Sequence, residues 1–496
     1  MTREQDLQSR SKDICLPYVT LQPDFAQVYT DVSQGLHTLE RAWLSVYCIN
    51  APKASIHAKL LLTYNRDARD GGVDVELESA FKNQLSIRRA EDSKLDFAVA
   101  STSKNGSFMA NTIKSSISLP ETKIRIPKRT LGPVVKGSIG VSAFDVSEAG
   151  NDLYVAGGAD GQAHIGRLGT GSEARAAGTS TVGSDSIEMI AQRRIQERAE
   201  QRSINSKTYL KGHVGDIRSA KFFPSGEVVL TTSSDCTARV FGIDGQNPRT
   251  LTGHRRAILD SDFIDRGKQV LTASMDGTTR LWDVSEGVQI SSFGSQNYSG
   301  VNRVNLDTSS SSSKLFFTGL SNGTVEAFDS SSKAARFRIG KVQFPFGPAP
   351  QASDSWKQSW SGSIESMDVC ADKHALLLGC GNGITLLHDM RMLSSSTSES
   401  EDVASSENSQ RSLLASWQRN GAAINDVKFI NDGKEALFAT SDGTPYRCDL
   451  TNSHDLSPRV TEEYNGWDVD NVEICRFDPI RSRVWLAGAD GMIRMY

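Results

Sequence analysis

Apolar runs alternate with polar turns in a repeating unit over most of the chain. In residues 250–285, TLTGHRRAILDSDFIDRGKQVLTASMDGTTRLWDVS, a Gly-His pair precedes an apolar run, a turn at residues 265–267, a second run and a Met-Asp-Gly turn. A third run closes on Leu-Trp-Asp. Short apolar runs separated by glycine-bearing turns predict consecutive β-hairpins. The unit therefore predicts a small antiparallel sheet.

Six other stretches share this rhythm. Residues 210–244, LKGHVGDIRSAKFFPSGEVVLTTSSDCTARVFGID, keep the Gly-His pair but have Phe241 where the first unit has tryptophan and Cys236 where it has the turn glycine. Five more lack the Gly-His pair and keep the strands and an Asp-Gly or Asn-Gly turn: residues 138–167, 301–329, 363–389, 424–450 and 471–496. We count seven units.

These units resemble WD repeats. A WD repeat is a four-stranded sheet of about 40–45 residues, and several such sheets stack around an axis as a propeller. The predicted fold is therefore all-β, a seven-bladed WD-repeat β-propeller preceded by a small, mostly β N-terminal domain. The last unit supplies three strands, so we expect residues 122–126 (TKIRI) to add the fourth and close the ring, which removes exposed sheet edges.

The resemblance also assigns a polar network to the two clearest units. In WD repeats the Gly-His histidine, a Ser or Thr, the turn aspartate and the tryptophan form hydrogen bonds in series, and such a connected network fixes strand register. The matching positions are His254, Ser274, Asp276 and Trp282, and, with Phe241 in place of tryptophan, His213, Ser233 and Asp235. A hydrolytic triad is the alternative interpretation of these residue types, but the spacing fits the structural network better.

The region before the repeats has a different texture. Strand-like runs at residues 42–49, 55–64, 72–78 and 95–100 lack the Asp-Gly rhythm, and a short helix is expected near residues 35–41. We expect residues 1–120 to form a small, mostly β N-terminal domain with a linker. Residues 121–496 then form the propeller, with insertions at 168–206, 340–362 and 391–412. The first contains an amphipathic helical pattern and the third is acidic and serine-rich.

Composition narrows the function. A net charge of −4 argues against a general binder of nucleic acid, which needs a basic footprint. Seven cysteines are scattered without a CxxC or Cys/His ligand spacing, so we expect neither a metal site nor a cofactor. The first residues form no signal-peptide core, and no apolar run approaches the length of a membrane span. We expect a soluble protein of the cytoplasm or the nucleus.

The units at residues 210–244 and 250–285 resemble one family in particular. FFPSG at residues 222–226, Ile-Leu-Asp at 258–260, Asp-Arg-Gly at 265–267 and the run 272–278 are similar to the proteasomal ATPase-associated factor family, which includes a fungal chaperone of proteasome regulatory-particle assembly. The resemblance covers about residues 210–284. It implies a non-catalytic assembly chaperone, monomeric when free, that binds the C-terminal domain of a proteasomal ATPase subunit and leaves when the base joins the proteolytic core.

Propellers usually bind partners on the top face, where each inner strand begins. Residues around these strand starts, with three tryptophans of the preceding loops, form the expected partner-binding set: Asp216, Arg218, Asn302, Trp356, Trp360, Ser363, Glu365, Asn425, Trp467, Asn471 and Glu473. Three of the four charged members are acidic, so a partner presenting Lys or Arg would be complementary. The alternatives are an ordinary solvated rim and, for the tryptophans, packing within their own loops.

Two other classes of function compete with the chaperone. A WD-repeat scaffold or substrate receptor in another complex, such as a ubiquitin ligase, would have the same fold, because fold alone does not determine function. An enzyme is disfavoured, because the chain shows no Ser-x-Gly type nucleophile elbow, no metal-ligand cluster and no phosphate-binding loop.

Overall fold

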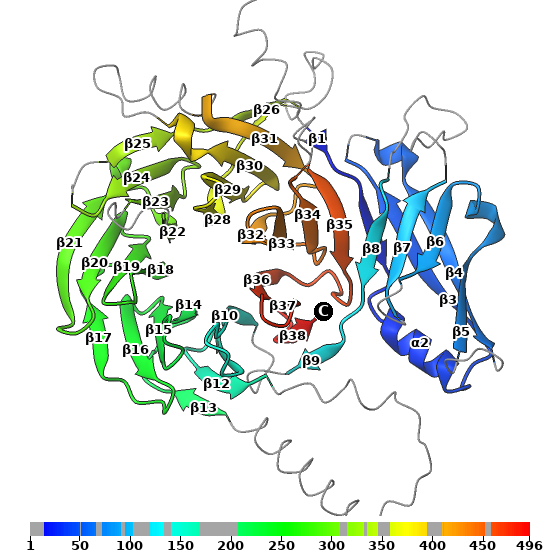
Figure 1. Cartoon of the computed structure of the whole chain (residues 1–496), viewed down its shortest axis with the longest axis horizontal. Coiled ribbons are helices and arrows are strands. Elements are labelled where there is room, and N and C mark those ends of the chain that lie inside the picture. Colours follow the sequence, from blue (N-terminus) through cyan, green and yellow to red (C-terminus); the bar gives the residue numbers. More distant parts are fainter. Residues whose placement is uncertain are drawn as a thin grey trace, which may run out of the picture.

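Four-stranded antiparallel sheets follow one another along the chain and are arranged around a common axis in the computed structural model (Figure 1). The structure describes residues 14–49, 51–65, 72–90, 95–102, 119–132, 140–168, 207–307, 315–331, 335–345, 358–393, 409, 411–451 and 458–496. The strand nearest the axis in each sheet is here called its inner strand. This arrangement, with many four-stranded antiparallel sheets, fits a β-propeller.

The sheets around the axis are each built from consecutive strands, except the last. In chain order they are β10 (Val141–Val146), β11 (Leu153–Gly158), β12 (Ala163–Arg167) and β13 (Thr208–Leu210); β14 (Ile217–Phe222), β15 (Val228–Ser233), β16 (Thr237–Gly242) and β17 (Arg249–Thr252); β18 (Ile258–Ile264), β19 (Gln269–Ser274), β20 (Thr278–Asp283) and β21 (Val288–Gly294); and β22 (Val301–Leu306), β23 (Leu315–Leu320), β24 (Val325–Asp329) and β25 (Ala335–Ile339).

The next three sheets complete the circle. They are β28 (Ile364–Cys370), β29 (Ala375–Cys380), β30 (Ile384–Asp389) and β31 (Leu413–Gln418); β32 (Ile424–Ile430), β33 (Glu435–Thr440), β34 (Tyr446–Asp449) and β35 (Arg459–Tyr464); and β36 (Val472–Asp478), β37 (Arg483–Gly488) and β38 (Ile493–Met495) with β9 (Arg129–Leu131). A short hairpin, β26 (Gln343–Pro345) and β27 (Gln358–Trp360), lies outside these sheets.

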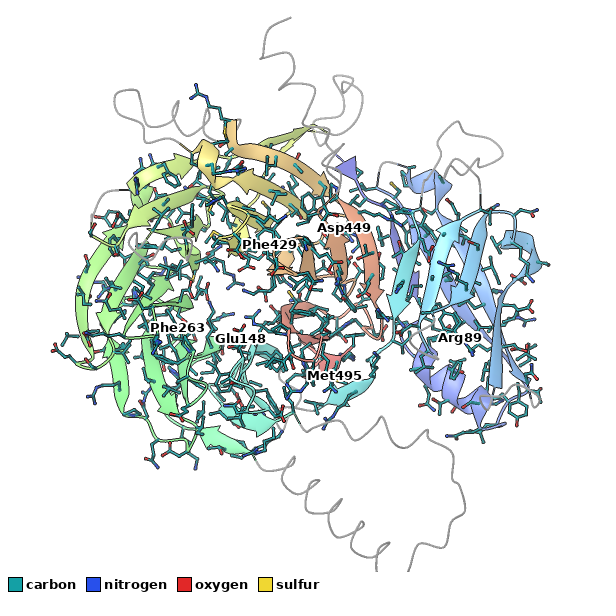
Figure 2. All side chains as sticks on the ribbon, in the orientation of Figure 1. Arg89, Glu148, Phe263, Phe429, Asp449 and Met495 are labelled. Carbon is teal, nitrogen blue, oxygen red and sulfur yellow. The ribbon has the colours of Figure 1, made fainter. Side chains whose placement is uncertain are left out.

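The second strand of each sheet is almost fully buried because neighbouring sheets cover both of its faces. All six residues of β11 and all six of β29 are buried, and their sequences, LYVAGG and ALLLGC, show little of the alternation typical of a half-exposed strand. Side chains fill the space between neighbouring sheets (Figure 2). Burial on two faces thus explains the continuous apolar runs in the repeats.

Three of these second strands approach the next sheet so closely that only glycine fits. A Cβ atom built on Gly157 would lie 2.7 Å from a side-chain carbon of Ile217, the first residue of the next inner strand. Gly319 stands in the same relation to Ile364, at 2.6 Å, and Gly379 to Ile424. The spacing between these sheets therefore depends on a missing side chain.

The strand that closes the circle is not the one predicted from the sequence. The strand that completes the last sheet is β9, with Leu131 opposite Ile493 and Arg129 opposite Met495. Residues 122–126 were expected there, and that prediction is wrong: β8 (Thr122–Arg125) instead pairs in parallel with β35. Ile124 and Ile126 belong to the apolar core of the N-terminal region, which explains why this more apolar run is used elsewhere.

The N-terminal region forms its own sheet and core. Strands β2 (Tyr18–Leu21), β3 (Leu39–Tyr47), β4 (Ile56–Asn65) and β5 (Gly72–Leu77) are antiparallel neighbours, and helix α2 (Phe25–Ser33) packs its Phe25, Tyr29 and Val32 into the same core. Short 3-10 turns lie at Pro52–Ala54 and Ser79–Phe81. The prediction of a helix near residues 35–41 is therefore wrong. The helix of this region begins ten residues earlier, and β3 begins at Leu39.

Strands from the N-terminal region extend two of the circular sheets. Strands β6 (Leu85–Arg89), β7 (Phe97–Ser101) and β8 continue the β32 sheet beyond β35, giving seven strands in one sheet (Figure 1). Strand β1 (Ile14–Cys15) pairs in parallel with β31. Backbone hydrogen bonds therefore join the N-terminal region to two neighbouring sheets.

Two arginines form buried ion pairs at this junction. The guanidinium of Arg125 lies 2.9 Å from Asp96 and 2.7 Å from Glu462. Beside it, Arg419 pairs with Glu463 at 2.6 Å, and the backbone N–H of Val19 donates to the same Glu463 carboxylate at 3.3 Å. Burial raises the pKa of Glu463 to about 7, although Arg419 acts in the opposite direction.

Substitution of Gly319 by alanine should destabilise the fold. The new methyl group would overlap Ile364, and overpacking of this kind costs about 1–3 kcal/mol. Gly421→Ala is the matched control, because no described atom lies within 4 Å of its added Cβ. Urea unfolding should show a loss for Gly319→Ala only. Equal losses in the two variants would contradict the contact between sheets.

The Glu463→Gln variant tests the buried junction by its pH dependence. Because the folded-state pKa of Glu463 is raised above its ordinary value of 4.5, its contribution to stability is full below pH 4.5 and is lost as the pH rises through about 7. Relative to Glu463→Gln, the native protein should lose up to about 3 kcal/mol of unfolding free energy over this range. Glu227→Gln, at an exposed turn, should run parallel to the native protein. Parallel curves for all three proteins would refute the prediction.

Candidate interaction surface

A chain of hydrogen bonds crosses the β18 sheet from its outer side to its top turn. The indole N–H of Trp282 donates to Thr272 Oγ1 at 2.8 Å, and Thr272 Oγ1 lies 2.8 Å from His254 Nε2. The other ring nitrogen, Nδ1, lies 2.8 Å from the carboxylate of Asp276. The pattern assigns the proton of His254 to Nδ1, so that Thr272 donates to Nε2 and every member has a partner.

The serine expected in this chain has a different place. Ser274 donates from Oγ to the Arg256 carbonyl at 3.1 Å and accepts from the Asp276 N–H, so it braces the turn. Thr272, two residues earlier, is the member between histidine and tryptophan. Both residues lie on the same face of β19, which is why the sequence could not distinguish them.

The β14 sheet repeats this arrangement with one member fewer. His213 lies 2.8 Å from Asp235 through Nδ1 and 2.9 Å from Thr231 through Nε2. Ser233 donates to the Gly215 carbonyl, as Ser274 does in its own turn. Phe241 occupies the tryptophan position and donates nothing, so Thr231 has no indole partner. As in the β18 sheet, threonine replaces the expected serine.

These contacts hold the turn aspartates ionised. Burial alone would raise the pKa of Asp276, but hydrogen bonds from His254, Thr278 and the Arg255 N–H outweigh burial, and the net pKa is lowered. Burial lowers the pKa of His213 despite the opposing effect of Asp235. A histidine held between a hydroxyl and a carboxylate is a structural element here, since these groups are engaged with one another.

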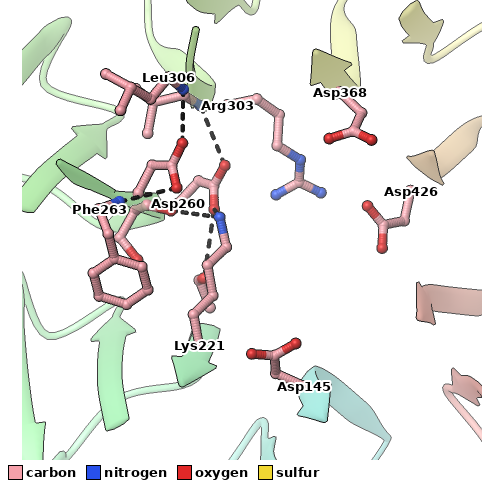
Figure 3. A network of polar contacts seen from close by, with 12 residues as sticks. Asp145, Lys221, Asp260, Phe263, Arg303, Leu306, Asp368 and Asp426 are labelled. Carbon is pink, nitrogen blue, oxygen red and sulfur yellow. Dashed lines mark hydrogen bonds and ion pairs between the residues drawn. The ribbon is translucent and has the colours of Figure 1, made fainter. Parts of the chain in front are cut away.

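A ring of polar side chains lines the channel along the axis, a cavity of about 790 Å³. The fifth residue of every inner strand faces it, and the charges largely alternate. In chain order these residues are Asp145, Lys221, Asp262, Asn305, Asp368, Lys428 and Arg476. Figure 3 shows part of the ring, with Arg303 extending from β22 toward Asp368 and Asp426.

Carboxylates of this ring accept backbone N–H groups from the neighbouring inner strand. Asp145 accepts from Phe222 at 2.9 Å, and Asp368 accepts from Phe429 at 2.7 Å. The same relation joins Asp262 to Leu306. Asp260 and Asp426, which lie two positions before the ring residues of their strands, accept in the same way from Val304 and Cys475. These N–H groups lie at the open edge of an inner strand, so the carboxylates supply acceptors that no adjacent strand provides.

Cations of the ring neutralise the carboxylates. Lys221 lies 3.1 Å from Asp260, and Lys428 lies 3.1 Å from Asp368. Arg476 bridges Asp426 and Asp145 at 2.5 and 3.3 Å, which joins the last sheet to the first. Burial nevertheless raises the pKa of Asp262, which accepts two backbone N–H groups. The channel charges are therefore engaged in holding the circle together.

This ring was not predicted from the sequence, although a signal was present. Each inner strand begins with Val or Ile and carries a charged or amide side chain at its fifth position. A polar residue recurring at one register of aligned repeats, inside a buried strand, indicates a shared acceptor or donor role. Thr231 and Thr272 could have been found in the same way, because both stand ten residues before the Phe241 or Trp282 position.

Several residues of the expected partner-binding set are occupied within the protein. Asn302 donates to the Ile364 carbonyl at 3.0 Å and Asn425 to the Val472 carbonyl at 2.8 Å, each joining its strand to the next sheet. Asn471 donates to Glu473 at 2.5 Å. Burial raises the pKa of Glu473, with Arg303 and Arg218 opposing. These residues lie together around the channel mouth, but their polar groups serve mainly the protein itself.

Other members of the set remain accessible. The side chains of Asp216 and Arg218 are 39% and 45% exposed and lie 3.6 Å apart, at the start of β14. Ser363 donates to Glu365 at 2.5 Å at the start of β28, and both are partly exposed. Acidic groups at these two strand starts are therefore available to a partner.

Of the three tryptophans in the set, only Trp467 has a described side chain, and it is not exposed. Trp467 is buried, with the Arg494 guanidinium 4.0 Å from its ring centroid and with Gly488 in close contact, so its assignment to partner binding is wrong. The missing side chain of Gly488 leaves the space into which the indole packs. Trp356 lies outside the described residues, and Trp360 lies in β27 at a position where only the backbone is described.

Among the residues that the structure describes, no group of three or more His, Cys, Asp and Glu side chains could hold a metal ion. Over the same residues, no helix is long and apolar enough to cross a membrane.

The hydrogen-bond chain predicts a difference between two matched variants. Thr272→Val removes the partner of both His254 Nε2 and Trp282 Nε1, whereas Thr231→Val removes the partner of His213 Nε2 and a longer contact, 3.3 Å, to the Arg239 carbonyl but leaves no indole N–H unpaired. A buried polar group without a partner costs about 1–3 kcal/mol. We therefore expect Thr272→Val to lower the unfolding free energy by about 1–3 kcal/mol more than Thr231→Val. Chemical denaturation measures both, and equal losses would place the indole N–H outside the network.

Comparison with known proteins identifies two of the sheets. A WD40 family profile, described as "WD domain, G-beta repeat", matches residues 204–242 and 245–283. A search of curated proteins found no match. The two matched ranges contain strands β13 to β20 and both hydrogen-bond chains. These two stretches are therefore similar to WD repeats, and the fold fits a β-propeller.

Proposed function

We propose that the chain is a seven-bladed WD-repeat propeller with a separate N-terminal β domain, and that it acts as a non-catalytic assembly chaperone. Its blades are the sheets that begin with β10, β14, β18, β22, β28, β32 and β36. Its partner is the C-terminal domain of a proteasomal ATPase subunit, bound during assembly of the regulatory-particle base in the cytoplasm or the nucleus.

Two kinds of observation support this proposal. WD repeats point to protein–protein interaction, and residues 210–284 resemble the proteasomal ATPase-associated factor family. The histidines, threonines and aspartates that could suggest catalysis, such as His254, Thr272 and Asp276, are engaged with one another in hydrogen bonds that stabilise the sheet. A role in binding is thus better supported than a role in catalysis.

The proposed location of the binding site rests on two accessible acidic groups at strand starts. Asp216 and Glu365 lie at the top of β14 and β28, next to the channel mouth. An acidic surface favours a partner that presents Lys or Arg, and charge complementarity increases both association rate and specificity. The proposed contact therefore uses these two positions and the part of the rim between them.

The test combines purified components with matched charge reversals. Binding of each proteasomal ATPase C-terminal domain is measured with the native chain, with Asp216→Lys/Glu365→Lys, and with Glu227→Lys/Asp372→Lys. The control acids are exposed at the other ends of β14 and β28, in the same two sheets. We expect one ATPase domain to bind the native chain and the control, and to bind the first variant at least about tenfold more weakly, or about 1.4 kcal/mol.

The possible outcomes separate the two parts of the proposal. If no ATPase domain binds the native chain, the chaperone assignment fails. Equal binding by both variants would keep the function and move the site away from Asp216 and Glu365.

A further inference from the structure

An open groove of about 470 Å³ separates the N-terminal sheet from the β32 and β36 sheets. One wall comes from β2 and β3, and the other from the loops after β33 and β35. The first wall includes Tyr18, Trp43 and Tyr47, and the second includes Asp442, Asp468 and Val469. Because backbone pairing through β8 and β1 holds the two regions together, the groove has rigid sides.

The first wall is aromatic. Tyr18 and Tyr47 are opposite each other in the β2–β3 pair and stack with ring centroids 5.2 Å apart. Trp43 lies four residues from Tyr47 on the same face of β3 and is 55% exposed. Lys59 covers one face of the Trp43 ring, 4.7 Å from its centroid. Exposed tryptophan and tyrosine in a concave site are typical anchors of protein contacts.

The second wall presents an apolar residue in a strained conformation. Val469 has φ 58° and is 76% exposed. A β-branched residue at positive φ is an outlier, and such strain persists only where the surrounding structure enforces it. The loop packs against the turn at Gly443, where a Cβ atom would lie 3.2 Å from Val469 Cα. The packing therefore holds an exposed valine side chain at the mouth of the groove.

The charges beside this valine are acidic. Asp442 accepts hydrogen bonds from Asn420 and Thr444 and interacts electrostatically with the buried Arg419, whereas Asp468 is exposed and has no ion pair with any residue that the structure describes. Arg419 is also paired with Glu463 and stacked on Tyr446 at 4.0 Å. The groove thus combines aromatic and aliphatic surface with the acidic groups of Asp442 and Asp468.

We propose that this groove binds a short peptide segment of a partner protein in which an apolar side chain adjoins a lysine or arginine. The apolar side chain lies among Trp43, Tyr47 and Val469, and the cation reaches Asp468 and Asp442. Charge complementarity with the two aspartates selects this occupant over an acidic or purely apolar segment. The groove is a second binding surface, and the inference does not depend on the chaperone assignment.

The test begins with a library of random short peptides displayed on phage and selected on the full-length chain. The enriched peptides are synthesised, and their affinities are measured by fluorescence anisotropy for the native chain, Asp468→Lys and Trp43→Ala. We expect enrichment of an apolar residue next to Lys or Arg, and binding at least about tenfold weaker in both variants. Asp372→Lys and Ile290→Ala, at an exposed turn and an exposed outer strand, should bind as the native chain does.

A charge exchange distinguishes direct contact from misfolding. Peptides with their basic residue changed to glutamate should bind Asp468→Lys better than the native chain, which a merely damaged groove could not do. Absence of enrichment, enrichment of acidic segments, or equal binding by the groove and control variants would each overturn the proposal. Sedimentation showing a dimer that Asp468→Lys dissociates would assign the groove to a second copy of the chain instead. Binding of ATPase domains by Asp468→Lys, measured separately, keeps this result independent of the proposed function.

Discussion

An inner strand of a circular array has one edge without a neighbouring strand, and this edge governs much of the structure described above. Its N–H groups point toward the channel, where an unpaired donor is costly. Carboxylates from the adjacent strand, such as Asp145 on the Phe222 N–H and Asp368 on the Phe429 N–H, accept them. The carboxylates in turn require cations, so Lys428 and Arg476 complete the ring. Satisfaction of backbone donors thus determines the charge pattern of the channel.

This internal use of polar groups bears on function. The channel ring and the chain from Trp282 to Asp276 contain most of the residue types that could perform chemistry, and their atoms are engaged with one another. What is left for other molecules lies outside them: acidic side chains at strand starts, and the aromatic groove beside the N-terminal sheet. The division is typical of a rigid scaffold whose loops carry the recognition.

The sequence predicted the elements whose signals are local. Turn glycines, apolar runs and the Gly-His pairs locate the sheets because each reflects a backbone requirement within one unit. It failed where the answer depends on contacts distant along the chain. Trp467 is a large aromatic residue in a loop, which suggested a surface anchor. It is buried because it packs against Gly488 and Arg494 of a later hairpin. The local sequence likewise could not show whether β8 or β9 closes the circle, because both are short strands. They differ in that Ile124 of β8 belongs to the N-terminal core, whereas β9 pairs with β38.

Strand β9 has a consequence for synthesis on the ribosome. It emerges from the ribosome long before its partner β38, which is made more than 350 positions later. Strands β1 and β8 also wait for β31 and β35. Since domains begin to fold from the N-terminal side during translation, the nascent chain must carry β1 and β9 unpaired, and β8 with one open edge, until these later strands are made. Ribosome stalling before β38 is made would therefore release a product with open sheet edges, a substrate for holding chaperones and quality-control proteases.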